Sequence, residues 1–380
     1  MKEKLWIVTT VADSLDSLIE GQPKFLNQYF DVTIVSSPSA RLITVAEREN
    51  VAWQAVKLSR TISPFRDLLS IWKMYRLLRK NRPDIIQSYT PKAGLVTMIA
   101  ARLARVPRRI HGVVGMPLME AQGIRRNIMK FAEQFTYVNA TALTSNSFGL
   151  REFIQAQLTK KPITVIGSGS INGVDVNYYD RANLNSNVRT SLGISEQSTV
   201  FVYVGRLVPD KGIVELVGAF LELADSGSPV DLFLLGEEEG DLTPLPTKTR
   251  KLMATSDSIH QLGWHPDVRP YLAAANVFVL PSYREGLPNS VLEAGAMSLP
   301  SIVTDINGCN EIVENGINGN LVPVKDSRKL REAMEFLREN RNEIEVMGNM
   351  ARVRVINSFE QEGFWIQLAG YYLSEELQQG

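Results

Sequence analysis

The chain has 380 residues, 44% hydrophobic and 22% charged, so it is long enough for two globular domains, and fibrous, disordered and disulfide-stapled classes are excluded. Its formal net charge is zero, yet residues 1–170 hold 24 Lys and Arg against 12 Asp and Glu, whereas residues 171–380 hold 17 against 29. The single cysteine, Cys309, excludes an internal disulfide and a Cys-based metal site, and it favours a reducing, cytoplasmic compartment.

Short β-rich apolar runs alternate with segments of helical period along the whole chain, which is the pattern of parallel sheets with crossover helices. In the first half the predicted strands are residues 5–11, 32–36, 51–58, 85–89, 109–113, 142–145 and 163–166. The alternation restarts in the second half, with predicted strands at residues 199–207, 231–235, 260–263, 277–281, 301–304 and 320–322. We therefore expect two doubly wound α/β domains.

The junction between the two sets of strands is the segment GSGSINGVDVNYYD, residues 167–180, which is rich in Gly, Ser and Asn and has no apolar periodicity. Its GSG leads into a linker instead of opening a helix after a first strand, so it is a weak match to a dinucleotide fingerprint. We predict an N-terminal domain over residues 1–168 and a C-terminal domain over residues 171–357. A terminal helix over residues 358–380 is expected to pack back on the first domain.

The segment EGLPNSVLE follows the predicted strand at 277–281 and places Glu285 and Glu293 eight residues apart. Ligands of open α/β sheets bind beyond the carboxyl ends of the strands, so both carboxylates could address hydroxyls of one ligand. An N-cap at Asn289 or Ser290 would put Glu293 in the first turns of a helix. The alternative is that the two glutamates merely favour a helix start. Backbone amides that would face an anion there belong to Gly286, Leu287 and Asn289.

The segment FVYVGRLVPDKGIVELVGAF reads as strand, turn and helix, with Arg206 at the strand end and Lys211 where the helix begins. A guanidinium, an ammonium and a helix dipole together would hold a phosphate, and Gly205 would let the backbone approach it. The pattern GxxxxGK[ST] is absent, so ATP hydrolysis is disfavoured. The alternative is an exposed ion pair of Lys211 with Asp210 or Glu215.

Four segments carry a family pattern: GRLVPDKG (205–212), LGWHPDV (262–268), the long stretch from VLPSYREGLPNSVLEAG to GNLVP (279–323) and, less sharply, GSINGVD (169–175). Together they resemble the retaining nucleotide-sugar glycosyltransferases of family 4, the group 1 transferases. Their GT-B fold has two facing Rossmann-like domains with a cleft between them. The resemblance is specific from about residue 160 to 330 and general before that.

The resemblance implies a role for each motif residue. Arg206 and Lys211 would hold the donor diphosphate, Glu293 the ribose hydroxyls and Glu285 the transferred sugar, while backbone near Leu262 would receive the base. It implies retaining transfer of a hexose or N-acetylhexosamine, with UDP as the expected nucleotide. Because two cations would neutralise the leaving diphosphate, we expect neither a metal nor another cofactor. The family's Gly-Gly pair after the first strand is replaced here by TTVADSLDSLIEGQ, in which Gly21 stands alone.

His111 ends a predicted first-half strand in the segment RRIHGVVGMP. A lone histidine in such a place is more often structural than catalytic. Many relatives, however, carry a cleft-facing histidine there, so we expect His111 to orient the sugar or acceptor or to handle a proton. His260 and His265 are read as structural.

Residues 64–80 are predicted to form an amphipathic basic helix with an apolar stripe that includes Leu68 and Trp72. A core stripe with a solvated opposite face explains any one such helix. Three basic clusters in the first half nevertheless favour docking on an anionic membrane, and no aromatic-interleaved motif indicates a nucleic-acid partner. The clusters are Arg66, Lys73 and Lys80; Arg102, Arg105, Arg108 and Arg109; and Arg125, Arg126 and Lys130.

The segments GCNEIV (308–313) and PSYREGLPNSVLEA (281–294) extend the resemblance to bacterial enzymes that lengthen polyprenyl-diphosphate-linked sugars. The implied acceptor is a lipid-linked saccharide of a capsule, O-antigen or other surface glycan. The implied location is the cytoplasmic face of the inner membrane, with the protein bound peripherally. Two alternatives are a UDP-sugar epimerase on the same scaffold and a non-catalytic two-lobed sugar-binding module.

Overall fold

The computed structural model describes residues 2–58, 63–119, 121–184, 186–225, 227, 229–239 and 243–374. The chain divides into two compact units, of which unit 1 comprises residues 1–172 and 362–380 and unit 2 comprises residues 173–361. The chain first passes from unit 1 to unit 2 after Asn172, a few residues beyond the predicted end of the N-terminal domain.

Unit 1 contains a seven-stranded, wholly parallel sheet with the strand order β3-β2-β1-β4-β5-β6-β7. All the strands predicted in the first half are present, although the runs at 5–11 and 51–58 give shorter strands. The bounds are β1 Lys4–Val8, β2 Asp31–Ser36, β3 Ala52–Ala55, β4 Ile85–Ser88, β5 Arg108–Val113, β6 Ala142–Ser145 and β7 Ile163–Val165.

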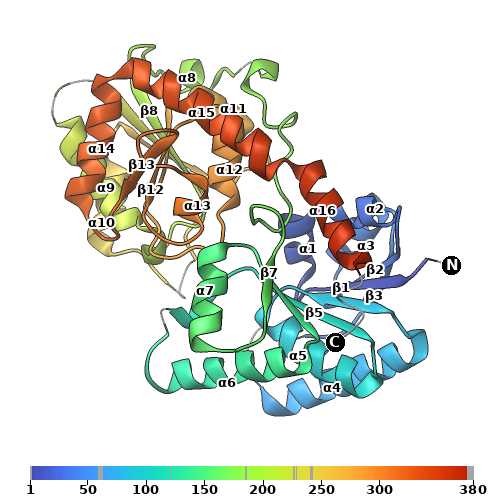
Figure 1. Ribbon diagram of the computed structural model, residues 1–380. Helices are drawn as coiled ribbons and strands as arrows, with labels where there is room; N and C mark the ends of the chain where they lie inside the picture. The colour runs from blue at the N-terminus through green and yellow to red at the C-terminus, as the bar shows by residue number, and fades with distance from the viewer. Residues whose placement is uncertain are drawn as a thin grey trace. The chain divides into compact units, whose positions relative to one another are not determined.

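Helices cover both faces of this sheet (Figure 1). Successive side chains of a strand point to opposite faces, so Leu5 and Ile7 of β1 enter one core while Trp6 and Val8 enter the other. The first of these cores lies under α1, α3 and α16, and the second under α4 to α7. The bounds are α1 Ala12–Ile19, α2 Gln22–Leu26, α3 Ala40–Glu49, α4 Pro64–Asn81, α5 Pro91–Ala104, η1 Pro117–Met119, α6 Gly123–Asn139, α7 Phe148–Gln157 and α16 Gln361–Leu373.

Helix α16 returns from the end of the chain to unit 1, where Tyr372 is fully buried and its carbonyl accepts a 2.7 Å hydrogen bond from Arg108. The single helix predicted over 358–380 is wrong in one respect. Glu360 adopts extended backbone with ψ 137°, which ends α15 at Phe359 and lets α16 begin separately at Gln361. The part of the prediction over 375–380 lies outside the described residues.

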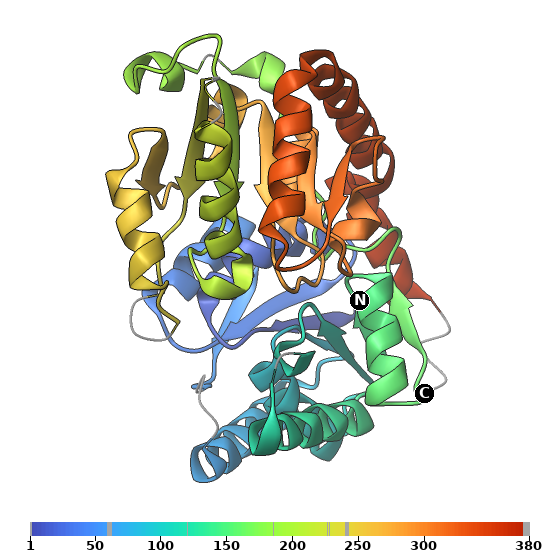
Figure 2. The same ribbon diagram turned by 90° about the vertical axis from the view of Figure 1, so that its left-hand side faces the viewer.

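Unit 2 has a parallel sheet in the order β10-β9-β8-β11-β12-β13 (Figure 2). The buried apolar side chains described on both sides of this sheet belong to one hydrophobic cluster. Each strand predicted in the second half has a counterpart. The strands are β8 Thr199–Val204, β9 Val230–Leu235, β10 Ile259–Gly263, β11 Val277–Leu280, β12 Ser301–Thr304 and β13 Gly319–Val322. The helices are η2 Arg181–Asn183, α8 Val188–Ser191, η3 Pro209–Lys211, α9 Ile213–Ala224, α10 Thr247–Thr255, α11 Arg269–Ala274, α12 Asn289–Ala296, α13 Cys309–Ile312, α14 Ser327–Glu339 and α15 Arg341–Phe359.

Both units therefore have the doubly wound Rossmann-like architecture expected from the sequence. In each sheet the first strand of the unit lies in the interior and the strand order reverses beside it, which creates a topological switch point. That point is between β1 and β4 in unit 1 and between β8 and β11 in unit 2. None of the helices in the described part of the chain combines the length and apolar character that crossing a membrane requires.

Candidate functional site

Three of the predicted site residues of the second half lie at the switch point of unit 2. Arg206 and Lys211 follow β8, and Glu285 lies in the loop that follows β11. Because β8 and β11 are parallel neighbours, the two loops emerge at the same edge of the sheet. The sequence could indicate each loop separately, and the topology of the sheet brings them together.

Lys211 and Glu285 are in direct contact, with 2.5 Å between the lysine Nζ and the carboxylate Oε1. Their side chains are only 19% and 12% exposed, so water screens this pair less than a surface pair. The alternative partners considered for Lys211 are both engaged elsewhere. Asp210 pairs with Arg284 at 2.9 Å, and Glu215 accepts hydrogen bonds from the Tyr283 hydroxyl.

Hydrogen bonds hold the β11–α12 loop to its two neighbouring loops. The Tyr283 amide donates to the Asp210 carbonyl of the β8–α9 loop at 2.9 Å, and the Asn307 side chain of the β12–α13 loop donates to the Glu285 carbonyl at 2.6 Å. Gly212 has φ +72°, and a Cβ atom there would lie 2.0 Å from the Pro281 carbonyl oxygen. A side chain at Gly212 would therefore separate the β8–α9 and β11–α12 loops, whose close contact positions Lys211 and Glu285 before any ligand arrives.

The side chain of Arg206 is more exposed than that of Lys211. The Arg206 side chain is 50% exposed and pairs with Glu239 at 2.6 Å. An exposed pair of this kind contributes about 0–1 kcal/mol, so redirecting the guanidinium toward an anion costs little. The preceding Gly205 has φ +155°, and a Cβ atom there would meet the buried Tyr203 hydroxyl at 2.8 Å. That hydroxyl in turn donates to the Arg206 carbonyl and fixes the backbone from which the side chain extends.

Glu293 lies in the second turn of α12, whose backbone N-cap is Pro288, one residue before the caps considered from the sequence. Burial raises the pKa of Glu293 to about 7, and a hydrogen bond with the Tyr179 hydroxyl works in the opposite direction. At neutral pH this carboxyl can therefore both donate and accept hydrogen bonds, which suits it to a ligand with hydroxyl groups. Tyr179 was not identified from the sequence, because nothing in NYYD distinguishes it from a linker residue.

Backbone donors are also available beside these side chains. The amides of Gly286, Leu287 and Asn289 donate no backbone–backbone hydrogen bond within the described part of the chain. They precede or begin α12, where the helix dipole favours negative charge. Leu262 lies in β10, one residue before the end of that strand and separated from β8 by β9, and a ring nitrogen of His265 lies 2.9 Å from its carbonyl oxygen. That contact gives His265 a structural partner.

The structure places His111 differently from the sequence-based expectation. A cleft-facing side chain was predicted, but His111 is 1% exposed and its ring packs against α5. Its Nδ1 lies 2.9 Å from the Ser88 hydroxyl, and a Cβ atom on Gly94 would lie 2.3 Å from the imidazole ring. Burial lowers the pKa of His111 to about 4, so the ring is neutral and is held as a structural group. Alternation along β5 explains the error, since the next residue, Gly112, faces the opposite side of the sheet.

The atypical first loop of unit 1 is short and tied down. Helix α1 begins at Ala12, directly after the loop, and the Thr10 hydroxyl lies 2.6 Å from that of Thr90 at the start of α5. The Ser14 amide donates to the Val11 carbonyl at 3.1 Å, so this amide is already engaged. Gly21 has φ +78° and packs against Trp365, which gives it a structural role away from this loop.

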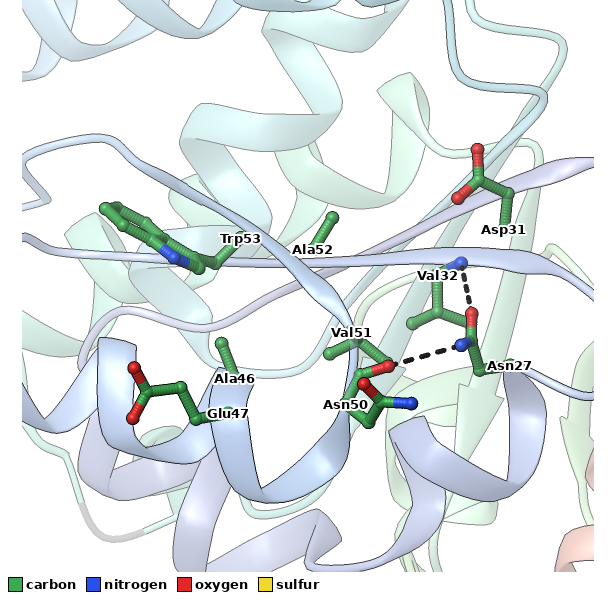
Figure 3. A pocket seen from close by; sticks show the side chains of 9 residues that line it. All are labelled: Asn27, Asp31, Val32, Ala46, Glu47, Asn50, Val51, Ala52 and Trp53. Carbon is green, nitrogen blue, oxygen red and sulfur yellow. Dashed lines mark hydrogen bonds between the residues drawn. The ribbon is translucent and has the colours of Figure 1, made fainter.

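A shallow pocket of unit 1 lies at the amino ends of the strands of its sheet (Figure 3). It is formed where β2 and β3 begin and α3 ends, so it faces away from the carboxyl ends of the strands. Asn27 crosses its floor, donating to the Asn50 carbonyl and accepting from the Val32 amide. These bonds join the elements of the fold, and we assign the pocket no part in the site.

Comparisons with known proteins identify the family. A family model described as glycosyl transferases group 1 matches residues 198–340, and one described as glycosyl transferase 4-like matches residues 19–147. Over 373 residues the chain is 32% identical to the capsular polysaccharide biosynthesis glycosyltransferase CapM of Staphylococcus aureus, with 97% of each chain covered. The chain belongs to the group 1 glycosyltransferases.

A second relative is the UDP-Gal:alpha-D-GlcNAc-diphosphoundecaprenol alpha-1,3-galactosyltransferase of Escherichia coli. It is 30% identical over 347 residues, which are 88% of this chain and 86% of the relative. Among solved structures, Anabaena HepE in complex with UDP and glucose aligns with a TM-score of 0.82 at 20% identity, covering 97% of this chain and 99% of that one. This likeness shows the fold, which is the GT-B fold with its two Rossmann-like units. Because the chain belongs to a family of glycosyltransferases, the alternative of a non-catalytic sugar-binding module is not supported.

Proposed function

We propose that this glycosyltransferase moves a hexose or N-acetylhexosamine from a UDP-sugar to a polyprenyl-diphosphate-linked saccharide, with retention at the anomeric carbon, during assembly of a bacterial surface polysaccharide. The observation that carries the proposal is the Lys211–Glu285 pair at the switch point of unit 2, flanked by Arg206. A cation for the diphosphate and a carboxylate for the sugar hydroxyls are held next to each other, as a sugar diphosphate requires.

The donor would occupy the carboxyl edge of unit 2. Lys211 and Arg206 contact the diphosphate, the amides of Gly286 and Leu287 supply further donors, and Glu293 holds the ribose hydroxyls. UDP is favoured because HepE was solved with UDP and the Escherichia coli relative is named for a UDP-sugar.

The transfer would proceed on one face of the sugar. The bond from the anomeric carbon to the β-phosphate oxygen breaks, and its electron pair stays on that oxygen. The leaving oxygen takes the proton of the acceptor hydroxyl, whose oxygen bonds to the anomeric carbon on the same face. Lys211 and Arg206 stabilise the charge that grows on the phosphate, while Glu285 orients the sugar. His111, which is buried and neutral, takes no part in this scheme.

We also propose that the reaction needs no metal, since two cationic side chains can neutralise the leaving diphosphate. Transfer should continue at an unchanged rate in excess EDTA. Loss of transfer in EDTA that Mg²⁺ or Mn²⁺ restores would contradict this part of the proposal.

The acceptor is proposed from the relatives and from the charge of the chain. The Escherichia coli relative is named for an acceptor on diphosphoundecaprenol, and CapM is named for capsular polysaccharide biosynthesis. The excess of Lys and Arg in residues 1–170 is complementary to a diphosphate-linked lipid in an anionic membrane. We therefore place the protein peripherally on the cytoplasmic face of the inner membrane, with no nucleic acid as partner.

The test is incubation with UDP-, GDP- and ADP-sugars, with and without a panel of polyprenyl-diphosphate glycans, followed by measurement of free nucleotide and of the lengthened glycan. The proposal expects UDP release that depends on the acceptor and a product with the donor's anomeric configuration. Conversion of the UDP-sugar without an acceptor would indicate the epimerase instead. Inversion at the anomeric carbon would contradict the retaining mechanism.

A further inference from the structure

Helix α4 of unit 1 carries an apolar stripe on its outer face. Phe65, which is 88% exposed, and Leu68, Leu69 and Trp72 recur at intervals of three, one and three residues and therefore share one side of the helix. The inner side is formed instead by residues such as Met74. The alternative considered for this stripe, that Leu68 and Trp72 pack in the core, does not fit their exposure, because both side chains are more than half exposed.

Helix α6 repeats this arrangement over its full length. Five exposed apolar residues follow one another at alternating intervals of four and three, which keeps them on one face. Phe131, which is 68% exposed, stacks on Phe135 with the ring centroids 5.9 Å apart. The five residues are Ile124, Ile128, Phe131, Phe135 and Val138.

The two stripes belong to the same layer of unit 1. Helix α5 packs against both α4 and α6, and both views show α4 and α6 along the same border of the unit (Figures 1 and 2). We call the exposed residues of α4 and α6 together the α4–α6 surface. A large apolar area of this kind on a globular unit marks an interaction surface.

The charge of these helices selects the partner. Helix α4 holds five Lys and Arg residues and α6 holds three, whereas each holds a single acid. Both acids are turned inward: Asp67 is buried and pairs with Lys92 at 2.6 Å, and Glu133 is buried. Arg76 lies over the Trp72 ring at 4.8 Å, which sets a cation beside the apolar stripe. The basic residues are Arg66, Lys73, Arg76, Arg79, Lys80, Arg125, Arg126 and Lys130.

We propose that the α4–α6 surface inserts its apolar side chains into the interfacial region of an anionic lipid bilayer, with its basic residues on the lipid phosphates. Exposed aromatic and aliphatic residues beside basic ones, with no exposed acid on either helix, are the pattern of a helix that lies in a membrane interface. A second copy of the chain fits less well, because pairing this surface with itself would bring eight cations against eight without a compensating acid.

This inference deepens the proposed function, since it names the side chains that would bring the enzyme to a lipid-linked acceptor. It also differs from docking by charge alone, because it requires the apolar residues. Vesicle binding needs neither donor nor acceptor, whereas UDP binding needs no vesicle, so failure of one proposal is distinguishable from failure of the other.

The experiment is flotation of the full-length protein with vesicles of phosphatidylcholine alone or with phosphatidylglycerol added. We expect at least about tenfold more protein on the anionic vesicles. The double variant Phe65→Ser/Phe131→Ser should lose most of this binding, as should Lys73→Glu/Arg125→Glu. Because all four side chains lie on the surface, the melting temperature and UDP affinity should stay at wild-type values.

Matched controls come from unit 2. Val346→Ser/Val353→Ser removes exposed apolar residues from α15, and Lys248→Glu/Lys251→Glu makes the same charge change on α10. Both controls should bind vesicles as the wild type does. Equal binding to neutral and anionic vesicles, or unchanged binding by Phe65→Ser/Phe131→Ser, would overturn the proposal. So would a wild-type dimer in light scattering that becomes monomeric in that variant while vesicle binding is unaffected.

Discussion

The two units share one architecture and use their charges differently. In unit 2 the charged side chains converge at the ends of β8 and β11, where Lys211 meets Glu285 and Arg284 meets Asp210. In unit 1 the basic residues of α4 and α6 are spread over outward-facing helices, among exposed apolar residues. The same fold thus offers a compact polar site in one unit and a broad basic and apolar surface in the other.

The comparison shows that a position at the end of a strand does not make a residue functional. Glu285 and His111 both belong to segments at the carboxyl ends of parallel strands. Glu285 lies in a loop beyond its strand and is part of a polar cluster, whereas His111 is still within β5 and faces the core. The contact made by the side chain therefore decides between a ligand site and a structural role.

The largest effect is expected from breaking the central pair. Lys211→Ala and Glu285→Ala should each lower kcat/KM by about 10² to 10³-fold, because each removes a group that stabilises the transition state. The double variant should cost far less than the product of the two, since the residues are in contact. Steady-state kinetics of UDP release provide the measurement, with Lys248→Ala as the control. Fully multiplicative effects would show that the two residues act independently.

A smaller effect is expected at Arg206, whose side chain is 50% exposed, compared with 19% for Lys211. Arg206→Ala should weaken UDP binding by about 10 to 10²-fold through loss of a charge-assisted contact. The free energy of unfolding should change little, because an exposed pair with Glu239 contributes little to stability. Calorimetric titration with UDP and chemical denaturation test the two parts separately. Destabilisation without loss of UDP affinity would give Arg206 a structural role instead.

The structural role assigned to His111 in unit 1 predicts a specific dependence of the unfolding free energy on pH. The folded-state pKa of His111 is about 4, below its ordinary value of 6.5, so its contribution to stability is present above pH 6.5 and is lost as the pH falls toward 4. His111→Asn keeps a polar group near Ser88 without this titration. Relative to the variant, the wild type should lose on the order of 3 kcal/mol of unfolding free energy over that window. Transfer kinetics should stay within about threefold, and a loss above 10²-fold would restore a catalytic role.

Glu133, also in unit 1, should make the free energy of unfolding depend on pH in the opposite direction. Burial raises its pKa from 4.5 to about 7, so the folded state holds the proton more tightly and stability falls as the pH rises from about 4.5 to 7. Glu133→Gln should remove this contribution, making the variant more stable than the wild type at pH 8 relative to pH 5. Thermal unfolding at the two pH values checks it. Burial also raises the pKa of Glu293, which is present in both the wild type and Glu133→Gln. The test is therefore the difference in pH dependence between the wild type and the variant. An identical pH dependence would contradict the account of Glu133.

The sequence predicted the parallel sheets well, because buried strands of a parallel sheet are continuous apolar runs between polar turns. It also predicted Arg206, Lys211 and Glu285 as site residues, because their residue types and their positions at strand ends are visible without coordinates. It could not show that Lys211 selects Glu285 over Asp210, because that choice depends on which strands are neighbours.

What the sequence left open has a common physical origin. Period and alternation show that a residue is on one face of an element, but they do not show which face is covered. His111 was expected to face a cleft and is in the core, whereas Trp72, for which both a core stripe and a membrane-docking face were considered, is exposed. Each outcome depends on the neighbouring helix, α5 in both cases, whose position no local pattern reveals.

The central claim is that the carboxyl edge of unit 2 holds the donor diphosphate. The most direct measurement is calorimetric titration of UDP into the wild type and into Arg206→Ala/Lys211→Ala, with Lys248→Ala/Lys251→Ala as the charge-matched control. The account predicts that removing both site cations weakens UDP binding by at least about 10²-fold, whereas the control binds as the wild type does. UDP binding that is unchanged in Arg206→Ala/Lys211→Ala would contradict it.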